Sequence, residues 1–306
     1  MDLLTEVLSS LRVSSTIFSR AELCTPWAVS TQGAATGIFH AVVTGGGTVR
    51  VAEGRAVPLK AGEVVLIPHG DPHVLSDGTS GRAVPIRSLP AEKLGATSVV
   101  RIRGPGPQTV ILCGTFRFES TLHPLMRGLP RALYARGQEG AEAQWMKTTL
   151  QMMADEAVSG RPGAPLMLTR LSDVLLVRAL RAHVNVIPEN GRGWLAAVRD
   201  PQVARALGLI HQRPDEDWTA DSMAEELGMS RSAFFERFRR LVGEPPASYL
   251  ARWRIHLAAR ALVDEGAGLK EAAERVGYSS EAALSKAFKR ITGKAPGEFR
   301  RERGAA

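Results

Sequence analysis

The sequence predicts an α+β protein with a β-rich N-terminal domain, a helical connector and an all-α C-terminal domain. Short β-branched runs separated by glycines lie between Ile38 and Val74, a pattern typical of compact antiparallel sheet. Apolar residues adopt helical spacing from about Trp145 onward. One pattern occurs twice in the last hundred residues, which indicates a repeated structural unit. We therefore expect domains at 1–125, 126–192 and 193–306.

Composition limits the classes of protein to which the chain can belong. Its 306 residues suffice for two ordinary domains, and 44% hydrophobic with 23% charged residues is a globular balance. No apolar run approaches the roughly 20 residues that span a bilayer, which argues against a membrane partner. The first eleven residues lack the basic region and apolar stretch of a secretory signal. We expect a cytoplasmic protein.

Charge and cysteine content narrow the choice of partner. The formal net charge of +8 suits a polyanion. The charge is dispersed, however, since from Pro201 onward 18 Lys and Arg stand against 15 Asp and Glu. Only two cysteines occur, Cys24 and Cys113, too few for a disulfide framework or a four-thiolate zinc site. Any chemistry of these thiols would be redox chemistry.

The N-terminal domain is expected to form a small barrel or sandwich. A stretch rich in Gly, Pro and Arg, from Asp77 to Gln108, has little periodicity and predicts a long loop. A strand-like run from Thr109 to Phe118 then closes the domain. Beyond it, the segment from Trp145 to Val184 is helical in pattern, and Ile187 to Gly193 predicts a linker. The apolar positions of the helical segment are Leu166, Leu168, Leu171, Val174, Leu175 and Val177.

The C-terminal repeat pairs the segment AEELGMS, from Ala224 to Ser230, with AERVGYS, from Ala273 to Ser279. Each copy predicts a helix, a turn at the glycine, a serine cap and a second helix, which together make a helix-turn-helix. The second turn is one residue longer than the first. The apolar residues that face the core are Phe234, Phe238 and Leu241 in the first copy, and Leu284, Phe288 and Ile291 in the second.

The opposite face of each second helix is free to enter a groove of DNA. This face carries Ser232, Phe235, Glu236 and Arg239 in the first copy, and Ala282, Ser285, Lys286 and Lys289 in the second. Positive charge concentrates here. The first copy sets Arg231, Arg237, Arg239 and Arg240 against Glu236, and the second sets Lys286, Lys289, Arg290 and Lys294 against Glu281. Contacts to phosphates would supply salt-dependent affinity and contacts to base edges sequence choice.

A single helix is predicted between the two units, from Tyr249 to Val263. Its apolar residues Trp253, Ile255 and Leu262 are available for packing. A rigid helix of this kind could hold two recognition helices about one turn of DNA, roughly 34 Å, apart.

The second copy resembles the signature of the AraC/XylS family of transcription regulators. The residues that carry the resemblance run from Gly277 to Ala283, from Phe288 to Arg290 and from Pro296 to Phe299. The match covers about residues 200 to 303. It implies that Ser232, Phe235 and Glu236 read bases from the first recognition helix, and Ala282, Ser285 and Lys286 from the second.

Two of these positions depart from the polar or basic groups that the family often offers there. Phe235 can touch a thymine methyl group, and Glu236 can accept a hydrogen bond from cytosine N4. Alternatively, Phe235 packs against neighbouring protein and Glu236 caps a helix or pairs with an arginine.

The N-terminal half carries a second resemblance. Gly62, Pro68, Gly70 and His73 reproduce the G(X)5PxG(X)2H pattern of cupin barrels. Together with Phe39-His40 and the run from Cys113 to Phe116, this segment is similar to the cupin-type sensor domain in one branch of the same family, which implies a cupin-like β-barrel. Pro26-Trp27 and His123-Pro124 extend the likeness over nearly the whole chain.

Cupins are often metalloenzymes, so His40, His69, His73 and His123 have to be weighed as metal ligands. A metal needs three or four converging donors. The His-x-His pair of metal-binding cupins is missing, because His40 is flanked by Phe39 and Ala41. We expect no cofactor and no enzymatic activity, with His40 and His73 at an effector site. A bound metal, and with it a cupin metalloenzyme, is the alternative.

The branch that the chain resembles includes oxidant-responsive members. Cys113, with or without Cys24, could therefore oxidise and shift the conformation of the sensor. The alternative is that Cys113 is a small buried apolar residue in a strand.

The two resemblances imply a sequence-specific regulator, and we expect an activator. It would bind double-stranded promoter DNA, act with RNA polymerase and respond to a small molecule or oxidant sensed in the cupin domain. By analogy with the family, the helices from Trp145 to Val184 would form the seam of a homodimer. An intramolecular core would produce the same apolar stripe.

Overall fold

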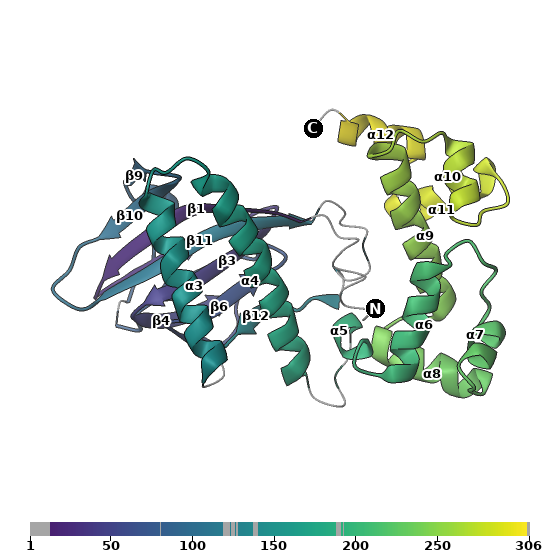
Figure 1. Cartoon of the computed structure of the whole chain (residues 1–306), viewed down its shortest axis with the longest axis horizontal. Coiled ribbons are helices and arrows are strands. Elements are labelled where there is room, and N and C mark those ends of the chain that lie inside the picture. The colour runs from purple at the N-terminus through teal and green to yellow at the C-terminus, as the bar shows by residue number, and fades with distance from the viewer. Residues whose placement is uncertain are drawn as a thin grey trace. The chain divides into compact units, whose positions relative to one another are not determined.

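The computed structural model describes residues 13–79, 81–118, 123, 126, 128–136, 140–187, 191 and 193–304. These residues divide into two compact units. The β unit comprises Val13–Glu119 and Pro130–Val186, and the helical unit comprises Ser120–Leu129 and Ile187–Ala306. The expected division had three parts. The structure instead gathers the helices of the connector into the β unit, because they pack on its larger sheet (Figure 1). Residues 188–190 and 192 of the expected linker lie outside the described residues.

The β unit contains two sheets. The larger has the strand order β12-β6-β3-β11-β1-β10-β9, and the smaller has the order β5-β4-β7-β2-β8. The strands of the larger sheet are β1 (Val13–Cys24), β3 (Gly37–Thr44), β6 (Val64–Ile67), β9 (Ala91–Leu94), β10 (Thr97–Ile102), β11 (Gln108–Phe118) and β12 (Leu133–Ala135). Those of the smaller sheet are β2 (Ala28–Thr31), β4 (Gly46–Val51), β5 (Val57–Lys60), β7 (His73–Ser76) and β8 (Val84–Pro85).

The two sheets form a sandwich rather than a closed barrel, so the expected cupin-like β-barrel is corrected in this one respect. Side chains from both sheets, among them Val42 and Ile111 from one and Val49 and Leu75 from the other, share one hydrophobic core. The smaller sheet ends at β5 and β8, which carry Pro58 and Pro85. Proline has no N–H to donate to a further strand, and this favours edge positions for both strands.

The long loop expected from Asp77 to Gln108 is also wrong in part. This stretch contains β8, a short 3-10 helix at Ile86–Ser88, and the strands β9 and β10. Strand β10 pairs in parallel with β1 and buries Val99 and Val100. Parallel pairing with a strand at the far N-terminal end of the unit is a non-local contact, which local residue patterns do not reveal.

Two long helices, α3 (Ala141–Val158) and α4 (Ala164–Val186), cover the larger sheet. Figure 1 shows them side by side on one face of it. Helix α3 buries Met146, Leu150 and Met153, and helix α4 buries residues that include Leu168, Leu175 and Leu180. Leu166 and Val174 do not belong to the core, since 63% and 42% of their surfaces are exposed. Among the described residues, no helix combines the length and apolar character needed to cross a membrane.

The helical unit confirms the doubled helix-turn-helix. Its helices are α5 (Trp194–Ala197), α6 (Pro201–Gln212), α7 (Ala220–Glu226), α8 (Arg231–Val242), α9 (Pro246–Val263), α10 (Leu269–Arg275), α11 (Glu281–Thr292) and α12 (Pro296–Gly304). Ser230 and Ser280 cap α8 and α11, each accepting a hydrogen bond from the backbone N–H three residues later. Phe234, Phe238 and Phe288 are fully buried beneath these helices.

Helix α9 joins the two helix-turn-helix units and begins three residues before its predicted start. Tyr249 contacts Phe238 of the first unit edge to face. Ile255 and Leu262 share a core with Phe288 of the second unit. Figure 1 shows α9 running between the two groups of helices. One helix is therefore part of both cores.

A group of buried histidines lies beside the first of these cores. The ring of His211, on α6, stacks on Trp253 at 3.9 Å between centroids, and its Nε2 lies 2.9 Å from the hydroxyl of Tyr249. His123 packs edge-on against His256 at 4.9 Å. Burial is the main cause that lowers the pKa of His211 to about 3 and that of His256 to about 4. Both rings are neutral in the folded protein at neutral pH.

We predict that acid destabilises the helical unit. The pKa of histidine in the unfolded chain is near 6.5. Below that pH the unfolded chain therefore binds protons at these two positions, whereas His211 and His256 of the folded protein stay unprotonated. The free energy of unfolding is then highest above about pH 6.5 and falls as the pH approaches 4. Between pH 7 and pH 5 the fall is about 2 kcal/mol per histidine. Urea unfolding at both pH values measures this effect. His211→Gln, which cannot titrate, should lose less stability on acidification, and an unchanged pH dependence would contradict the assignment.

Corresponding glycines in the two turns have different surroundings. Gly228 and Gly277 both have positive φ, +64° and +73°. A Cβ atom on Gly228 would meet nothing within 4 Å, whereas one on Gly277 would lie 2.4 Å from the carbonyl oxygen of Asp215. The second turn is therefore pressed against the loop between α6 and α7.

We predict unequal costs for alanine at these two glycines. Gly228→Ala should cost only the left-handed backbone penalty, about 1–2 kcal/mol. Gly277→Ala should cost about 1–3 kcal/mol more, because backbone must move to relieve the overlap. Denaturant unfolding followed by tryptophan fluorescence, in a chain with Trp27 and Trp145 of the β unit replaced by phenylalanine, reports on the helical unit through Trp194, Trp218 and Trp253. Equal costs would show that the approach to Asp215 is not tight.

Candidate nucleic-acid interface and sensor site

The first recognition helix, α8, exposes most of the residues expected to meet DNA. Arg231, Ser232, Glu236 and Arg239 are exposed and Phe235 is half-buried. Arg231 lies 3.5 Å from the carboxylate of Asp221 on α7, an exposed ion pair that is worth little in water and that a phosphate can replace. The buried residues Phe234, Phe238 and Leu241 hold the opposite face of α8 in the core. The outer face is polar and accessible.

The second recognition helix, α11, presents a corresponding face. Ala282, Lys286 and Lys289 are exposed and Ser285 is half-buried. Leu284, Ala287 and Phe288 hold its inner face. Each recognition helix therefore offers small residues in its first turn and at least one exposed cation on the same face.

One arginine that was counted with the basic face of α8 has a structural role instead. Arg237 donates to the carboxylate of Asp200 at 2.7 and 2.8 Å. Asp200 also caps α6 by accepting from the N–H groups of Gln202 and Val203. Arg237 therefore ties α8 to the start of α6.

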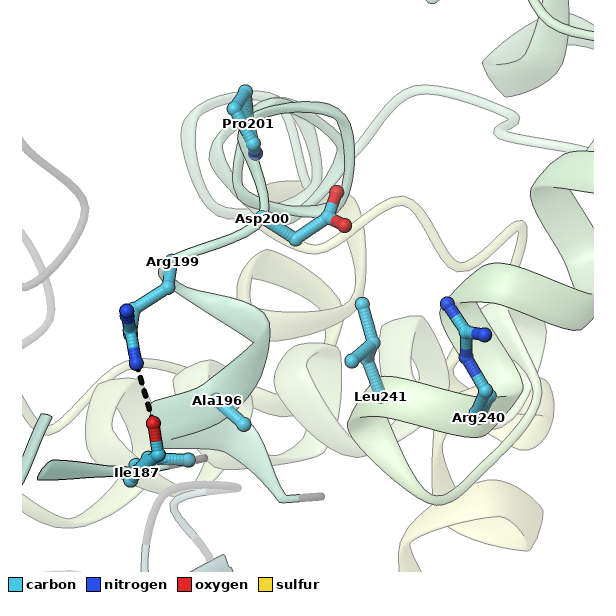
Figure 2. A pocket seen from close by; sticks show the side chains of 7 residues that line it. All are labelled: Ile187, Ala196, Arg199, Asp200, Pro201, Arg240 and Leu241. Carbon is cyan, nitrogen blue, oxygen red and sulfur yellow. Dashed lines mark hydrogen bonds between the residues drawn. The ribbon is translucent and has the colours of Figure 1, made fainter. Parts of the chain in front are cut away.

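A polar cavity of about 270 Å³ lies next to this contact (Figure 2). Its lining includes Arg199, Asp200 and Arg240, and Arg199 donates to the carbonyl oxygen of Ile187. Figure 2 shows that Arg240 and Leu241 line the cavity from one segment, and Asp200 and Pro201 from another. Asp200 thus lines the cavity with a carboxylate that already binds Arg237 and caps α6.

In the β unit, three of the four predicted sensor residues form one buried row. His40 on β3 lies between Cys113 of β11 and His73 of β7. Its Nδ1 is 3.1 Å from Cys113 Sγ, and its Nε2 is 2.8 Å from His73 Nε2. His73 Nδ1 is 2.8 Å from the carbonyl oxygen of Asp71. All three side chains are at least 94% buried.

The last contact fixes the direction of every hydrogen bond in the row. A carbonyl oxygen only accepts, so His73 Nδ1 donates to Asp71 and its Nε2 accepts from His40 Nε2. His40 Nδ1 is then the acceptor, and the Cys113 thiol donates to it. Each ring is neutral and uses both of its nitrogens.

The protonation states agree with this pattern. Burial, with the neighbouring His73 as a smaller cause, lowers the pKa of His40 well below its usual value. Burial also lowers the pKa of His73, against the opposing effect of its bond to Asp71. Burial raises the pKa of the Cys113 thiol to about 12. The row therefore carries no charge at neutral pH.

Cys24 does not join this row. It is half-buried at the end of β1, where it pairs with Gln108, while Cys113 pairs with Ser19. The two cysteines are thus five residues apart along the β1–β11 ladder, or about 17 Å at the rise of a strand. A disulfide needs Cα atoms less than about 7 Å apart, so Cys24 and Cys113 cannot be bridged in this fold.

The four histidines weighed as metal ligands do not converge. His69 is exposed, and His123 belongs to the helical unit, where it contacts Trp253 and His256. The Nε2 atoms of His40 and His73 share a hydrogen bond, so neither has a free lone pair that could bind a metal. Within the described ranges, no three His, Cys, Asp or Glu side chains form a group that could hold a metal ion. The residues present do not fit a cupin metal.

Sequence reasoning missed two features of the helical unit. One is the group of buried histidines around Trp253. The other is Arg254 on α9, whose guanidinium reaches three backbone carbonyls. Neither carries a motif, because both depend on segments that meet only in the folded unit.

Comparisons with known proteins agree with this architecture. A family model described as Cupin matches residues 2–185, and one described as Helix-turn-helix domain matches residues 223–302. A putative AraC-like transcription regulator of Streptomyces lividans is 34% identical, with 98% of each chain covered. The regulator AlkR of Acinetobacter baylyi is 26% identical over 99% of this chain and 100% of that protein.

Among solved structures, the DNA-binding domain of AdpA in complex with a target DNA is 31% identical. It aligns with 35% of this chain and 95% of that chain at a TM-score of 0.33. The full-length relatives and the two family models together span both units. The chain therefore belongs to the AraC family of DNA-binding transcription regulators and carries a cupin ligand-sensing domain.

Proposed function

We propose that this regulator is an activator that docks α8 and α11 into successive major grooves of a promoter, under the control of a signal sensed in the β unit. The observation that carries the proposal is the pair of exposed polar faces on two helices joined by α9. Helix α9 has 18 residues and is about 27 Å long, compared with roughly 34 Å for one turn of DNA. Activation would then proceed through contact with RNA polymerase.

The exposed faces allow a division of labour among the contact residues. Ser232, Glu236, Ser285 and Lys286 have groups that can hydrogen-bond base edges, whereas Arg231, Arg239 and Lys289 suit phosphates. Ala282 has room to approach a thymine methyl group. Phe235, being half-buried, can both pack on its own helix and present a ring edge to such a methyl group.

A small-molecule signal suits the sensor better than oxidation of Cys113. The reactive form of cysteine is the thiolate, and Cys113 is a buried thiol that donates to His40. Any ligand that competes for the polar atoms of His40 or His73 would have to break the buried row, which couples binding to a rearrangement between β3, β7 and β11. If the signal is an oxidant, the half-buried Cys24 is the accessible thiol.

A homodimer would use the outer faces of α3 and α4. Trp145 and Met152 of α3 and Leu166, Met167 and Val174 of α4 are exposed. Helix α3 carries Lys147 against three acidic residues, whereas α4 carries Asp173 against three arginines. An antiparallel pairing of two copies would place the acidic helix against the basic one, a favourable electrostatic arrangement.

Full-length protein should therefore select genomic fragments whose affinity rises steeply as salt falls, and the signal should alter that affinity. The selection is run under reducing conditions and repeated with a mild oxidant in the absence of thiol. A change with oxidant that Cys24→Ser abolishes and Cys113→Ser preserves would identify Cys24 as the sensor. Affinity that is indifferent to oxidant supports a small-molecule effector. Failure to enrich any fragment at low salt would contradict the proposal.

The residues assigned to phosphates have a separate signature. We predict that Arg239→Ala and Lys289→Ala each lower the slope of log affinity against log salt by about 0.9, because each variant leaves one phosphate without its cation. Affinity should fall for specific and non-specific duplexes alike, because a phosphate carries no sequence. Lys93→Ala, at an exposed position on β9 of the sensor, serves as the control and should leave the slope unchanged. Wild-type slopes in the two helix variants would remove these residues from the interface.

A further inference from the structure

Arg254 lies in the middle of α9 and contacts both helix-turn-helix units at once. Its Nε donates to the carbonyl oxygen of Pro214 at 2.6 Å, and its Nη2 donates to that of Glu216 at 2.8 Å. Its Nη1 donates to the carbonyl oxygen of Gly277 at 3.2 Å. The first two acceptors belong to the loop between α6 and α7, and the third belongs to the turn between α10 and α11.

The two segments that Arg254 joins also touch each other directly. Gly277 packs so closely on the loop that a Cβ there would overlap the backbone of Asp215. The guanidinium of Arg254 also lies 5.7 Å from the ring centre of Tyr278, the next residue of the turn. This arrangement has no counterpart at Gly228, around which a Cβ would find open space.

The loop is itself braced, so it can act as a rigid support. Trp218 Nε1 donates to the carbonyl oxygen of Arg213 at 2.9 Å, and the Arg213 guanidinium lies 4.8 Å from the centre of the Trp218 ring. Arg213 also pairs with Glu216 at 3.3 Å and with Glu226 of α7 at 3.6 Å. These contacts attach the loop to the first helix-turn-helix unit.

We infer that Arg254 is a positioning residue that sets the orientation of α11 relative to α8. If α9 were the sole connection, the two helix-turn-helix units could change their relative orientation as α9 bends, because long helices are rarely straight. The Arg254 contacts remove this freedom by fixing a loop of the first unit and the turn of the second to the same guanidinium. The planar fork of arginine provides donors in several fixed directions, and lysine cannot reproduce this arrangement.

This inference rests on the proposed docking of both helices. Once one helix is bound, the other binds intramolecularly, and a fixed geometry raises its effective concentration at the second groove. The contacts should therefore affect the coupling between the two half-sites and leave the affinity of each separate half-site unchanged. They should also make the protein selective for one half-site spacing.

The geometry is tested first without DNA. Spin labels at Glu236→Cys on α8 and Lys286→Cys on α11, in a full-length chain with Cys24 and Cys113 replaced by serine, report the distribution of distances between the recognition helices. We expect a narrow distribution with Arg254 and a broader one in Arg254→Lys, which keeps the charge and most of the stem. Arg260→Lys is the matched control, since it lies on the same helix and pairs with Glu265. An unchanged distribution in Arg254→Lys would overturn the inference.

The consequence is tested with a duplex selected from a randomised pool by the full-length wild-type protein. Three forms are compared: the selected duplex, one with the bases facing α11 scrambled, and a series with one to five base pairs inserted between the half-sites. Arg254→Lys should bind the selected duplex about tenfold or more weakly, bind the scrambled duplex like the wild type, and discriminate less among spacings. Equal weakening on the selected and scrambled duplexes, or a wild-type spacing profile, would overturn the inference.

The same series separates the inference from the function on which it rests. If the wild-type protein bound the scrambled duplex as tightly as the selected one, docking of both helices would be wrong. The role of Arg254 in half-site coupling would fail with it. Broadened spin-label distances in Arg254→Lys would then show only that the contacts orient the two units.

Discussion

The helical unit depends on the participation of one helix, α9, in two hydrophobic cores. Its N-terminal half packs through Tyr249 against the first helix-turn-helix, and its C-terminal half packs through Ile255 and Leu262 against the second. Because each core contains at least one fully buried phenylalanine, moving either helix-turn-helix unit along α9 would expose large apolar surfaces. The separation of the recognition helices is thus set by the length of α9, because α9 is packed in both cores. The orientation of the two helix-turn-helix units about the axis of α9 is a separate degree of freedom. Hydrogen bonds from side chains of α9 to the backbone of each unit can fix it.

The β unit obeys a different constraint, which is the cost of burying polar groups. Cys113, His40 and His73 lie between two sheets where an unpaired polar group would be expensive. These side chains are stabilised by hydrogen bonds to one another and to a backbone carbonyl. The bonds run in one direction, from Cys113 through His40 to His73 and Asp71, and none of the groups is charged. His73, which the sequence offers as a candidate metal ligand, here accepts a hydrogen bond from His40 and donates one to the carbonyl oxygen of Asp71. Under the proposed function, the signal acts by disrupting these hydrogen bonds.

The sequence predicts the parts of this fold that depend on local periodicity. The doubled pattern, the serine caps and the buried positions of α8 and α11 follow from helical spacing and turn chemistry alone, as do the residues that face outward. What depends on non-local pairing does not follow. The parallel contact of β10 with β1 turned an expected loop into sheet, and the edge strands β5 and β8 left two open sheets in place of a barrel.

The roles of individual side chains likewise depend on non-local contacts that the sequence does not reveal. Arg237 resembles its neighbours on α8 in sequence, but Asp200, 37 positions away, converts it into a structural residue. His123 follows the predicted sensor segment yet packs with His256 and Trp253. Arg254 has no motif, because its acceptors are backbone atoms that any residues could supply. Function carried by such contacts becomes visible only when the segments are placed in space.

Under the proposed function, one copy of the chain places two recognition helices on the same duplex. Chemical footprinting of the major groove, with full-length protein on a selected duplex, distinguishes this arrangement from binding by a single helix. We expect two protected patches on the same face of the DNA, centred about 10 base pairs apart, one of which disappears when the exposed residues of α11 are replaced. A single protected patch that survives those replacements would contradict it.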